Sequence, residues 1–311
     1  MRWTIPSLEA LRAGGKPAMA RALGLVETAE GNLELTSLLD MAARTPKGDV
    51  LGLTGPPGVG KSTLTNVLIA RARASGRTVA VVAIDPSSQR TGGALLGDRT
   101  RLRTDPEDDG IFVRSMAARD RLGGLSDHAI AAIVLMRAIY DFVIVESVGV
   151  GQSEGDVAHV ADMILLLVQP GSGDSLQFMK AGIMELPDLI AVTKADMGSA
   201  ATRAVADLEG ALTLQADMDR RPRVLAVSSL QGDGLDRLMD ALRHLGEQMR
   251  QSGIRASRRQ SQGRIWFEDA VRRRFGTEGL GAIAVPQSAS DAPFQAIADA
   301  TLMLRHRLLL T

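Results

Sequence analysis

The sequence predicts an α/β fold in which helices cover both faces of a mostly parallel β-sheet. Short, continuous apolar runs alternate along the chain with segments in which apolar residues recur every three or four positions. Continuous apolar runs are typical of strands buried on both faces of a parallel sheet, whereas the second pattern is typical of helices. The predicted strands are 50–54, 79–84, 111–115, 142–145, 161–169, 189–192 and 223–227.

The composition limits the kinds of partner. Thirty-six basic residues balance 36 acidic ones, and aromatic residues make up 3% of the 311 positions. This balance gives no net field to attract nucleic acid or an anionic membrane, and few platforms for stacking bases. The absence of cysteine removes disulfides and thiolate metal sites and fits a reducing compartment. Since no apolar segment is typical of a signal or a membrane span, we expect a cytoplasmic protein with no nucleic-acid or membrane partner.

The segment 55–62, GPPGVGKS, has the spacing of a phosphate-binding P-loop. It follows a predicted strand and precedes helical periodicity over 63–75, which is the required context. The backbone N–H groups of such a turn and the positive end of the helix dipole attract phosphate oxygens. We expect Lys61 to reach the β- and γ-phosphates and Ser62 to ligate Mg²⁺. The fold class is therefore that of a P-loop NTPase. The candidate phosphate-binding residues are Gly55, Pro57, Gly58, Val59, Gly60, Lys61, Ser62 and Thr63.

Acidic residues follow two further predicted strands. Asp85 comes after 79–84 and Glu146 after 142–145, at the edge where parallel sheets bind ligands. We expect Asp85 to face Mg²⁺ or the attacking water and Glu146 to hold Mg²⁺ or its water. A buried Glu146 without a cation would be costly. Asp98 lies in the long polar connection 89–103 and could reach the metal. An ordinary Asp–Pro turn at Asp85 and a solvated loop acid at Asp98 are the alternative interpretations.

A glycine three residues after Glu146 fits a sensor of the γ-phosphate. The N–H of Gly149 can bond this phosphate and lose the bond on hydrolysis. The next residue is Val150 rather than a glutamine that could orient water, so we expect slow intrinsic hydrolysis. The candidate catalytic residues are Lys61, Asp85, Glu146 and Gly149, and the candidate metal ligands are Ser62, Asp85, Asp98 and Glu146.

The segment 193–196, TKAD, predicts which base is bound. The carboxylate of Asp196 can accept hydrogen bonds from N1–H and the 2-amino group of guanine, and adenine offers neither donor. The stem of Lys194 can lie along the base plane. The backbone N–H groups of Ser228, Ser229 and Leu230, after the last predicted strand, could donate to guanine O6. The sequence therefore predicts GTP and GDP, with Mg²⁺, as ligands, and places Thr193 in the base-binding motif.

The rest of the chain divides into a central domain and two extensions. Predicted helices cover 7–45 with breaks at two glycine positions, 126–139, a segment carrying Lys180, 234–249 and 294–310, and 277–293 is expected to be irregular. Eight arginines lie between Arg250 and Arg274, which favours a packing or dimer helix with a solvated basic face over a nucleic-acid arm. The predicted domains are an N-terminal helical extension (1–47), a P-loop GTPase domain (48–250) and a C-terminal helical dimerisation arm (251–311).

These motifs resemble those of the MeaB/ArgK/MMAA family of P-loop GTPases, which are chaperones of adenosylcobalamin-dependent acyl-CoA mutases. The resemblance covers about residues 8 to 250. It is carried by LGLTGPPGVGKSTL, VAVVAIDPSSQRTGGALLGDRTR, DFVIVESVGVGQSE, LLLVQPGSGDSLQFMKAGI and DLIAVTKAD.

The resemblance implies GTP and Mg²⁺ binding, slow hydrolysis, a homodimer built partly through C-terminal helices, and a mutase as partner. It implies switch segments at 86–109, 149–160 and 171–182. Gln152 falls in the second, and Lys180 matches a lysine that couples the third to the mutase.

Two positions depart from the family pattern. Thr193 stands where the base-binding motif usually has Asn, which would weaken base affinity or the anchoring of the loop. Ser147 replaces the usual Thr after Glu146.

Two other functions fit the same fold. A nickel-delivery GTPase has a similar architecture, although the chain has no cysteine and its four histidines are scattered. An ATP-dependent kinase is the second alternative. A protein-targeting GTPase is disfavoured, because no methionine-rich basic domain follows the core.

Overall fold

The structure of the protein is a computed structural model. It describes residues 4–29, 31–85, 102, 104–117, 125–147, 155–171, 186–213 and 221–309, with Asp85 and Leu309 described by their backbone alone.

The described part of the chain forms one parallel sheet of seven strands in the order β3-β2-β4-β1-β5-β6-β7. Each apolar run named above corresponds to one strand, to within two residues at each end. Because β1 lies between β4 and β5, the loop that follows it opens beside the ends of both neighbours. The strands are β1 (Asp49–Thr54), β2 (Val79–Asp85), β3 (Ile111–Ala117), β4 (Phe142–Glu146), β5 (Met163–Val168), β6 (Leu189–Val192) and β7 (Arg223–Ala226).

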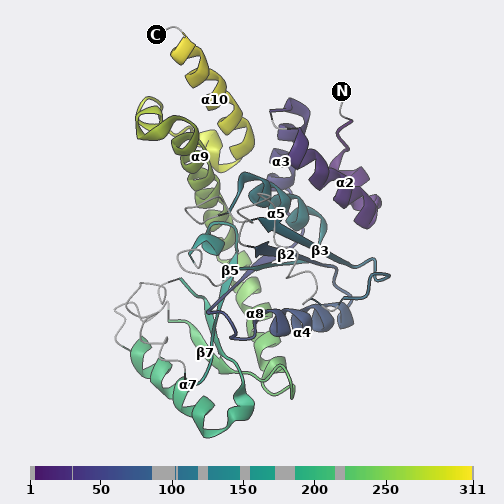
Figure 1. The fold of residues 1–311 in the computed structure, drawn as a ribbon, viewed down its shortest axis with the longest axis vertical. Helices are drawn as coiled ribbons and strands as arrows, with labels where there is room; N and C mark the ends of the chain where they lie inside the picture. Colours follow the sequence, from purple (N-terminus) through teal and green to yellow (C-terminus); the bar gives the residue numbers. More distant parts are fainter. Residues whose placement is uncertain are drawn as a thin grey trace.

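Helices cover both faces of the sheet (Figure 1). The helix α5 and the N-terminal helices pack on one face, and α4 with α8 packs on the other. The fold class predicted from the sequence is confirmed. Among the described residues the helices are α1 (Leu8–Ala13), α2 (Gly15–Thr28), α3 (Leu33–Arg44), α4 (Lys61–Ala74), α5 (Asp127–Ile139), α7 (Ser199–Leu212), α8 (Leu235–Gln251), α9 (Ile254–Gly281) and α10 (Pro293–Leu309), and short 3-10 helices lie at η2 (Asp156–His159), η4 (Ala195–Met197) and η6 (Gln287–Ser290).

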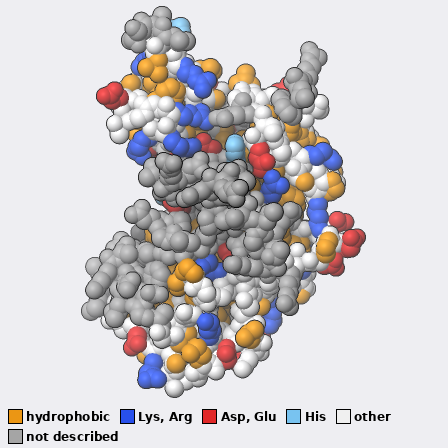
Figure 2. All heavy atoms as spheres, in the orientation of Figure 1, with side chains coloured by type: hydrophobic (Ala, Val, Ile, Leu, Met, Phe, Trp, Pro, Cys, Tyr) orange, Lys and Arg blue, Asp and Glu red, His pale blue; other side chains and the backbone are white. Residues whose placement is uncertain are grey.

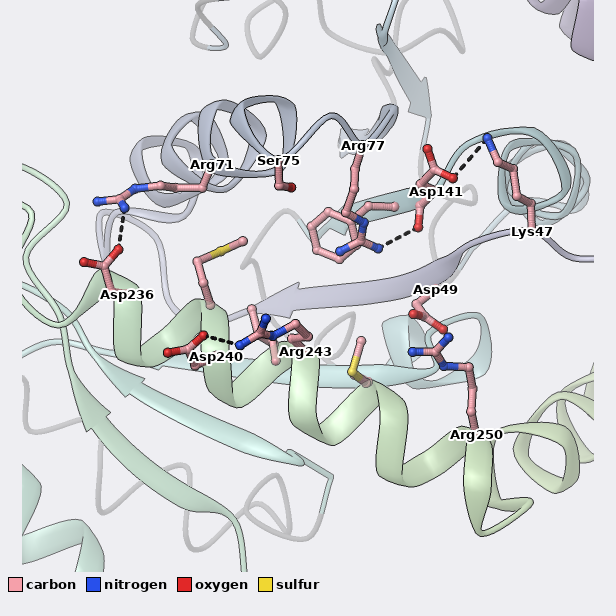
Figure 3. Close-up of a pocket in the computed structure, with 14 residues that line it drawn as sticks. Lys47, Asp49, Arg71, Ser75, Arg77, Asp141, Asp236, Asp240, Arg243 and Arg250 are labelled. Atoms are coloured by element: carbon pink, nitrogen blue, oxygen red, sulfur yellow. Dashed lines mark hydrogen bonds and ion pairs between the residues drawn. The ribbon is translucent and has the colours of Figure 1, made fainter.

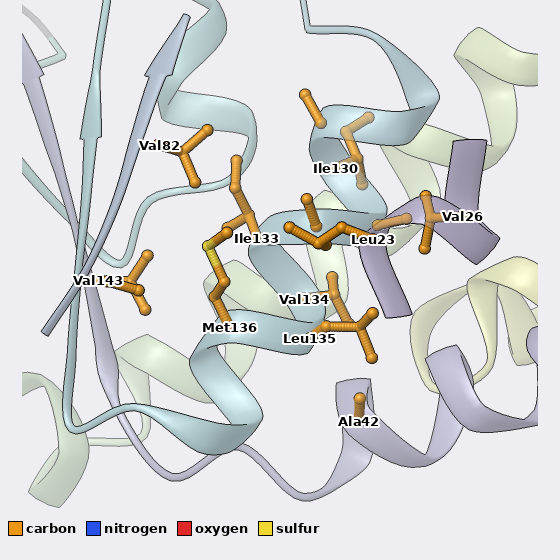
Figure 4. Close-up of a cluster of buried hydrophobic side chains, with 14 of the residues drawn as sticks. Leu23, Val26, Ala42, Val82, Ile130, Ile133, Val134, Leu135, Met136 and Val143 are labelled. Atoms are coloured by element: carbon orange, nitrogen blue, oxygen red, sulfur yellow. The ribbon is translucent and has the colours of Figure 1, made fainter. Parts of the chain in front are cut away.

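Alternate residues of the strands enter different cores. Val50 and Val143 face α5, whereas Leu51 and Ile144 face α4 and α8. Figure 4 shows Val82 and Val143 of the sheet pointing toward Ile133 and Met136 of α5. The helix α5 is buried along most of its length because α2 and α3 cover its other side. This second layer of helices explains why α5 is apolar around its circumference.

Two expectations about secondary structure were incomplete. The helix α7 was not predicted, although Ala201, Leu208 and Leu212 share its buried face. The segment 277–293 is not irregular throughout, because α9 continues to Gly281 across a kink. At the kink Gly276 adopts φ 72° and ψ −174°, a conformation that favours glycine, and helical structure resumes beyond it.

Arginines of α9 hold the amino ends of the strands. Arg255 binds Asp49 at the start of β1. Arg258 binds Asp188 just before β6 through two hydrogen bonds of 2.8 and 3.0 Å. The prediction of a solvated basic face is therefore wrong for this half of α9. Its charges are paired with acids that other elements bring to the same edge.

A third arginine of α9, Arg259, binds the buried carboxylate of Asp162. Arg259 donates to it through Nε at 2.7 Å and Nη2 at 2.6 Å, and the N–H of Val50 donates to the same group at 2.8 Å. Further along α9, arginines are exposed, and Figure 2 shows Lys and Arg side chains over the upper left of this face, where α9 and α10 lie.

The N-terminal helices are joined to α10 by Asp40 of α3. Its carboxylate accepts hydrogen bonds from the N–H groups of Phe294 and Gln295. Burial raises the pKa of Asp40.

Candidate functional site

The carboxyl ends of all seven described strands lie along one edge of the sheet, since the strands are parallel. Glu146 ends β4 and pairs in register with Leu53 of β1, one residue before the strand's last residue. The loops after β6 and β7 begin at the same edge. The topology thus brings together motifs that are separated by up to about 170 residues in the sequence.

The P-loop turns sharply between β1 and α4. Gly60 precedes α4 with φ 102°, and Gly55 has φ 144°, conformations that L side chains rarely adopt. A Cβ on Gly55 would lie 2.5 Å from the carbonyl oxygen of Leu167 in β5, so glycine is needed there for close approach as well. Lys61 is buried and its Nζ donates to the carbonyl oxygens of Gly55 at 2.7 Å and Pro56 at 3.0 Å. The amine charge is therefore held against the loop itself.

The carboxylate of Glu146 gathers two hydroxyl groups from α4. Ser62 Oγ donates to Glu146 Oε1 at 2.7 Å and Thr65 Oγ1 donates to Oε2 at 2.9 Å. Glu146 is 5% exposed, so these contacts are made away from bulk water. Thr65 was missed in the sequence analysis. Its spacing of three from Ser62 places both hydroxyls on one face of the helix, and that signal could have identified it.

The side chain of Thr193 ties the base-binding loop to the P-loop. Its Oγ1 is buried and lies 2.9 Å from the carbonyl oxygen of Val59 and 3.2 Å from that of Val168. From the sequence, a threonine in place of asparagine was expected to weaken base affinity or the anchoring of this loop. In the structure, the threonine hydroxyl makes a contact between the loop and the P-loop backbone.

Asp196 is held by the side chain of Ser228, for which the sequence predicted a role of the backbone N–H alone. Ser228 Oγ donates to Asp196 Oδ1 at 2.6 Å, whereas Ser229 and Leu230 lie in the turn that follows. Leu230 is 84% exposed. Lys194 adopts the left-handed conformation with φ 55°, and its Nζ donates to Gln169 Oε1 at 2.5 Å. The predicted base-contacting loops therefore meet at one place.

Several predicted residues lie outside the described part of the chain. These are Asp98, Gly149, Gln152 and Lys180, together with the side chain of Asp85, whose backbone ends β2. Among the residues that are described, no group of three or more histidines and acids is arranged to hold a metal ion. Nor does any helix in the described ranges combine the length and apolar character needed to cross a bilayer.

A cavity of about 780 Å³ lies away from the P-loop, at the amino ends of the strands between α4 and α8 (Figure 3). Most of its charged side chains form pairs of opposite sign, whereas Arg77 and Arg250 donate to backbone carbonyl oxygens. Arg243 binds Asp240 at 2.8 Å and Lys47 binds Asp141 at 3.0 Å. Since its four acidic residues offset four of its five basic ones, the cavity has little net charge to attract a ligand.

Comparisons with known proteins agree with this geometry. Residues 19–280 match the sequence profile of the family described as methylmalonyl-CoA mutase-associated GTPase MeaB. GTPase ArgK of Escherichia coli is 37% identical over 285 residues, covering 88% of this chain and 86% of that protein. The mitochondrial methylmalonic aciduria type A homolog of Mus musculus is 38% identical over 226 residues, covering 71% of this chain and 54% of that protein.

A solved structure shares the fold over nearly the whole chain. It is described as a LAO/AO transport system kinase, is 28% identical, covers 96% of both chains and has a TM-score of 0.66. The profile matches most of the chain, and the relatives align over most of its length. Both agree with the observed fold and with the P-loop. The chain belongs to the MeaB family of P-loop GTPases.

Proposed function

We propose that this GTPase is a chaperone that gates adenosylcobalamin loading and protects or reactivates an acyl-CoA mutase. The carrying observation is the match of residues 19–280 to a family described by its association with methylmalonyl-CoA mutase. The mouse relative, named for methylmalonic aciduria, supports the same partner class. Methylmalonyl-CoA mutase or a related branched-acyl-CoA mutase is the proposed partner.

The proposed nucleotide is GTP, held between the P-loop and the loop at Asp196. The turn at Gly58 and Gly60 would bind the phosphates through backbone N–H groups, with Lys61 supplying a positive charge. Asp196 would accept the donors of guanine. Its carboxylate is oriented by Ser228, and the geometry that supports this role is the 2.6 Å hydrogen bond between them.

The oxygens around Glu146 fit a magnesium ion. Mg²⁺ prefers hard oxygen ligands and is commonly bound by a hydroxyl, a carboxylate and substrate phosphates. Ser62 Oγ and a Glu146 carboxylate oxygen are 2.7 Å apart, so we propose that these two side chains hold the ion directly or through water. Such an ion would neutralise charge that develops on the phosphates. Asp85 and Asp98 stay candidate ligands.

The proposed cycle is slow without the partner. Val150 offers no side chain that could orient water, so we propose that hydrolysis accelerates only when the mutase completes the site. A group supplied in trans can contribute about 10³- to 10⁵-fold. Gly149, Gln152 and Lys180 are the proposed links between nucleotide state and the mutase. A homodimer formed through the C-terminal arm is part of the same proposal.

The test is cofactor loading of a mutase. The purified chain is mixed with the methylmalonyl-CoA mutase of the same organism, and transfer of adenosylcobalamin is followed by absorbance with GTP, GDP or no nucleotide. We expect loading to depend on nucleotide and to lose this dependence with Lys61→Ala, which removes triphosphate binding. Thr202→Val, on the exposed face of α7, is the matched control. Equal loading in all three nucleotide states would refute the chaperone role.

The same preparation separates the alternatives. Competition between GTP and ATP tests the kinase, which requires preference for ATP. Metal analysis after GDP exchange tests the nickel-delivery GTPase, which requires stoichiometric nickel outside the nucleotide site.

A further inference from the structure

A second cavity lies at the end of the sheet opposite the P-loop. Its volume is about 290 Å³, and it is enclosed by the end of α3, by α5, by α9 and by the segment leading into α10. Four arginines line it, Arg44, Arg137, Arg255 and Arg259, against one acid, Asp291. This volume is near the lower end of the range for small-molecule sites.

The most deeply buried of these side chains is Arg137 of α5. It is 2% exposed, and its guanidinium carbon lies 5.8 Å from the ring centroid of Trp266, which also lines the cavity. Its Nε and Nη1 atoms are buried, and no described residue accepts a hydrogen bond from either. Buried guanidinium groups are normally paired, because an unpaired buried charge is costly.

The nearby acids are already engaged by other arginines. Asp162 is bound by Arg259 through two hydrogen bonds, and Asp49 is bound by Arg255. Asp291 lines the cavity but makes no ion pair with Arg137 among the described residues. Burial lowers the pKa of Arg137 to about 9, and the neighbouring charge of Arg259 acts in the same direction. The cavity thus has an excess of positive charge at its deepest residue.

The guanidinium group of Arg137 indicates the chemical class of ligand that the cavity would bind. A guanidinium stacked on an aromatic ring keeps its N–H groups in its own plane, where a planar or tetrahedral oxyanion can accept two of them. The indole of Trp266 and the side chains of Ala43 and Pro46 provide apolar walls beside it. We propose that this cavity binds a small anion through Arg137, and that the recognised group is a carboxylate or a phosphoryl group.

Trp266 supplies a direct measurement. The chain has two tryptophans, so Trp3→Phe leaves Trp266 as the sole reporter. In this background, with Mg²⁺ and saturating GDP to occupy the P-loop, fluorescence is titrated with inorganic phosphate and separately with malonate at constant ionic strength. We expect a saturable change. A change with both anions indicates a general oxyanion site, and a change with one identifies the group. No saturable change with either overturns the proposal.

The role of Arg137 is tested by Arg137→Met, which keeps an unbranched apolar stem and removes the guanidinium group with its charge. We expect the affinity for the active anion to fall by about tenfold or more, equivalent to about 1.4 kcal/mol. Arg264→Met, an exposed arginine of α9 outside the cavity, should leave the affinity unchanged. Equal affinity in Arg137→Met and its parent overturns the proposal. Should that variant fail to fold, Ala43→Leu decides, since Ala43 is a half-buried residue of the cavity wall and the larger side chain takes up space beside it while all four arginines are kept. Unchanged affinity in Ala43→Leu also overturns it.

Discussion

The hydroxyl of Thr193 lies 2.9 Å from the carbonyl oxygen of Val59 and joins the end of β6 to the P-loop. The two residues are 134 positions apart in the sequence. Thr193 is buried, so the bond is shielded from water. The contact makes the position of the base-binding loop depend on that of the phosphate-binding loop.

Removing this bond should weaken nucleotide binding. Thr193→Val keeps the shape but leaves a buried carbonyl without its donor, at a cost of about 1–3 kcal/mol. We expect the GDP dissociation constant to rise by about tenfold, measured by calorimetry. Thr202→Val on exposed α7 is the matched control. If both variants bind GDP like the parent, the contact does not support the site.

Glu146→Gln should uncouple nucleotide binding from magnesium. The carboxylate accepts Ser62 and Thr65 through separate oxygens, and an amide keeps the volume with one acceptor and no charge. We expect the gain in GTP affinity on adding Mg²⁺ to shrink by about 10- to 100-fold, which is the usual effect of changing a residue that binds or orients the ligands of a metal ion. Thr65→Val removes one of the two donors and should give a smaller loss. A full magnesium effect in Glu146→Gln would contradict the assignment.

Asp196→Asn should change which base is preferred. An amide can donate to the 2-oxo group of xanthine, whereas the carboxylate accepts the 2-amino group of guanine. A hydrogen bond to a charged group contributes about 1.5–3 kcal/mol, so the GTP-to-XTP preference should shift by about tenfold or more in competition assays. Ser228→Ala should retain guanine preference with lower affinity, because it frees the carboxylate without altering its charge. Unaltered GTP selectivity in Asp196→Asn would exclude this role.

Arg259→Met should destabilise the whole domain. Asp162 is 1% exposed, and loss of its guanidinium partner leaves an uncompensated charge beside β1 and β5. Breaking a buried pair in this way costs about 3–5 kcal/mol in the free energy of unfolding, measurable by denaturant titration. Arg264→Met, exposed on the same helix, should change it by about 0.5 kcal/mol or less. Similar midpoints for the two variants would show that the pair is replaceable.

The pair between Arg73 and Asp108 should give a pH-dependent contribution to stability. Arg73 donates to both carboxylate oxygens at 2.8 Å, and this bond, with the N–H of Gly110, lowers the pKa of Asp108. A lowered folded pKa stabilises above the unfolded value of about 3.9, and this contribution is lost as the pH falls through the folded pKa. Asp108→Asn should therefore be less stable at pH 7 and show a shallower loss of stability below about pH 4. Parallel curves for the two proteins would contradict this.

Much of the fold could be predicted because its signals are local. Apolar runs identified the strands, and the glycines of 55–60 with Lys61 identified the P-loop. The helix α7 was missed because its buried face depends on three residues spread over 12 positions. The extension of α9 was missed because Gly276 is a typical breaker, and only packing against α10 favours a helix on both sides of it.

For the candidate site, the sequence predicted residues at or after the ends of strands, but not the side chains that hold them. Lys61 and Asp196 follow strands and Glu146 ends one, and the parallel order brings strand ends together. The residues that hold them were not predicted. Thr65 could have been identified from its spacing of three from Ser62, whereas the hydroxyl hydrogen bond of Ser228 to Asp196 carries no periodic signal.

The sequence by itself determined that this protein binds a nucleotide at a P-loop, because that function needs consecutive residues in one turn. Only the tertiary structure decided that Thr193 contacts Val59, that Arg259 binds Asp162 and that Arg137 is buried beside Trp266. Hydrophobic periodicity fixes which face of an element is buried. It does not fix which polar group on another element meets that face, since this depends on strand order and on the register of packed helices.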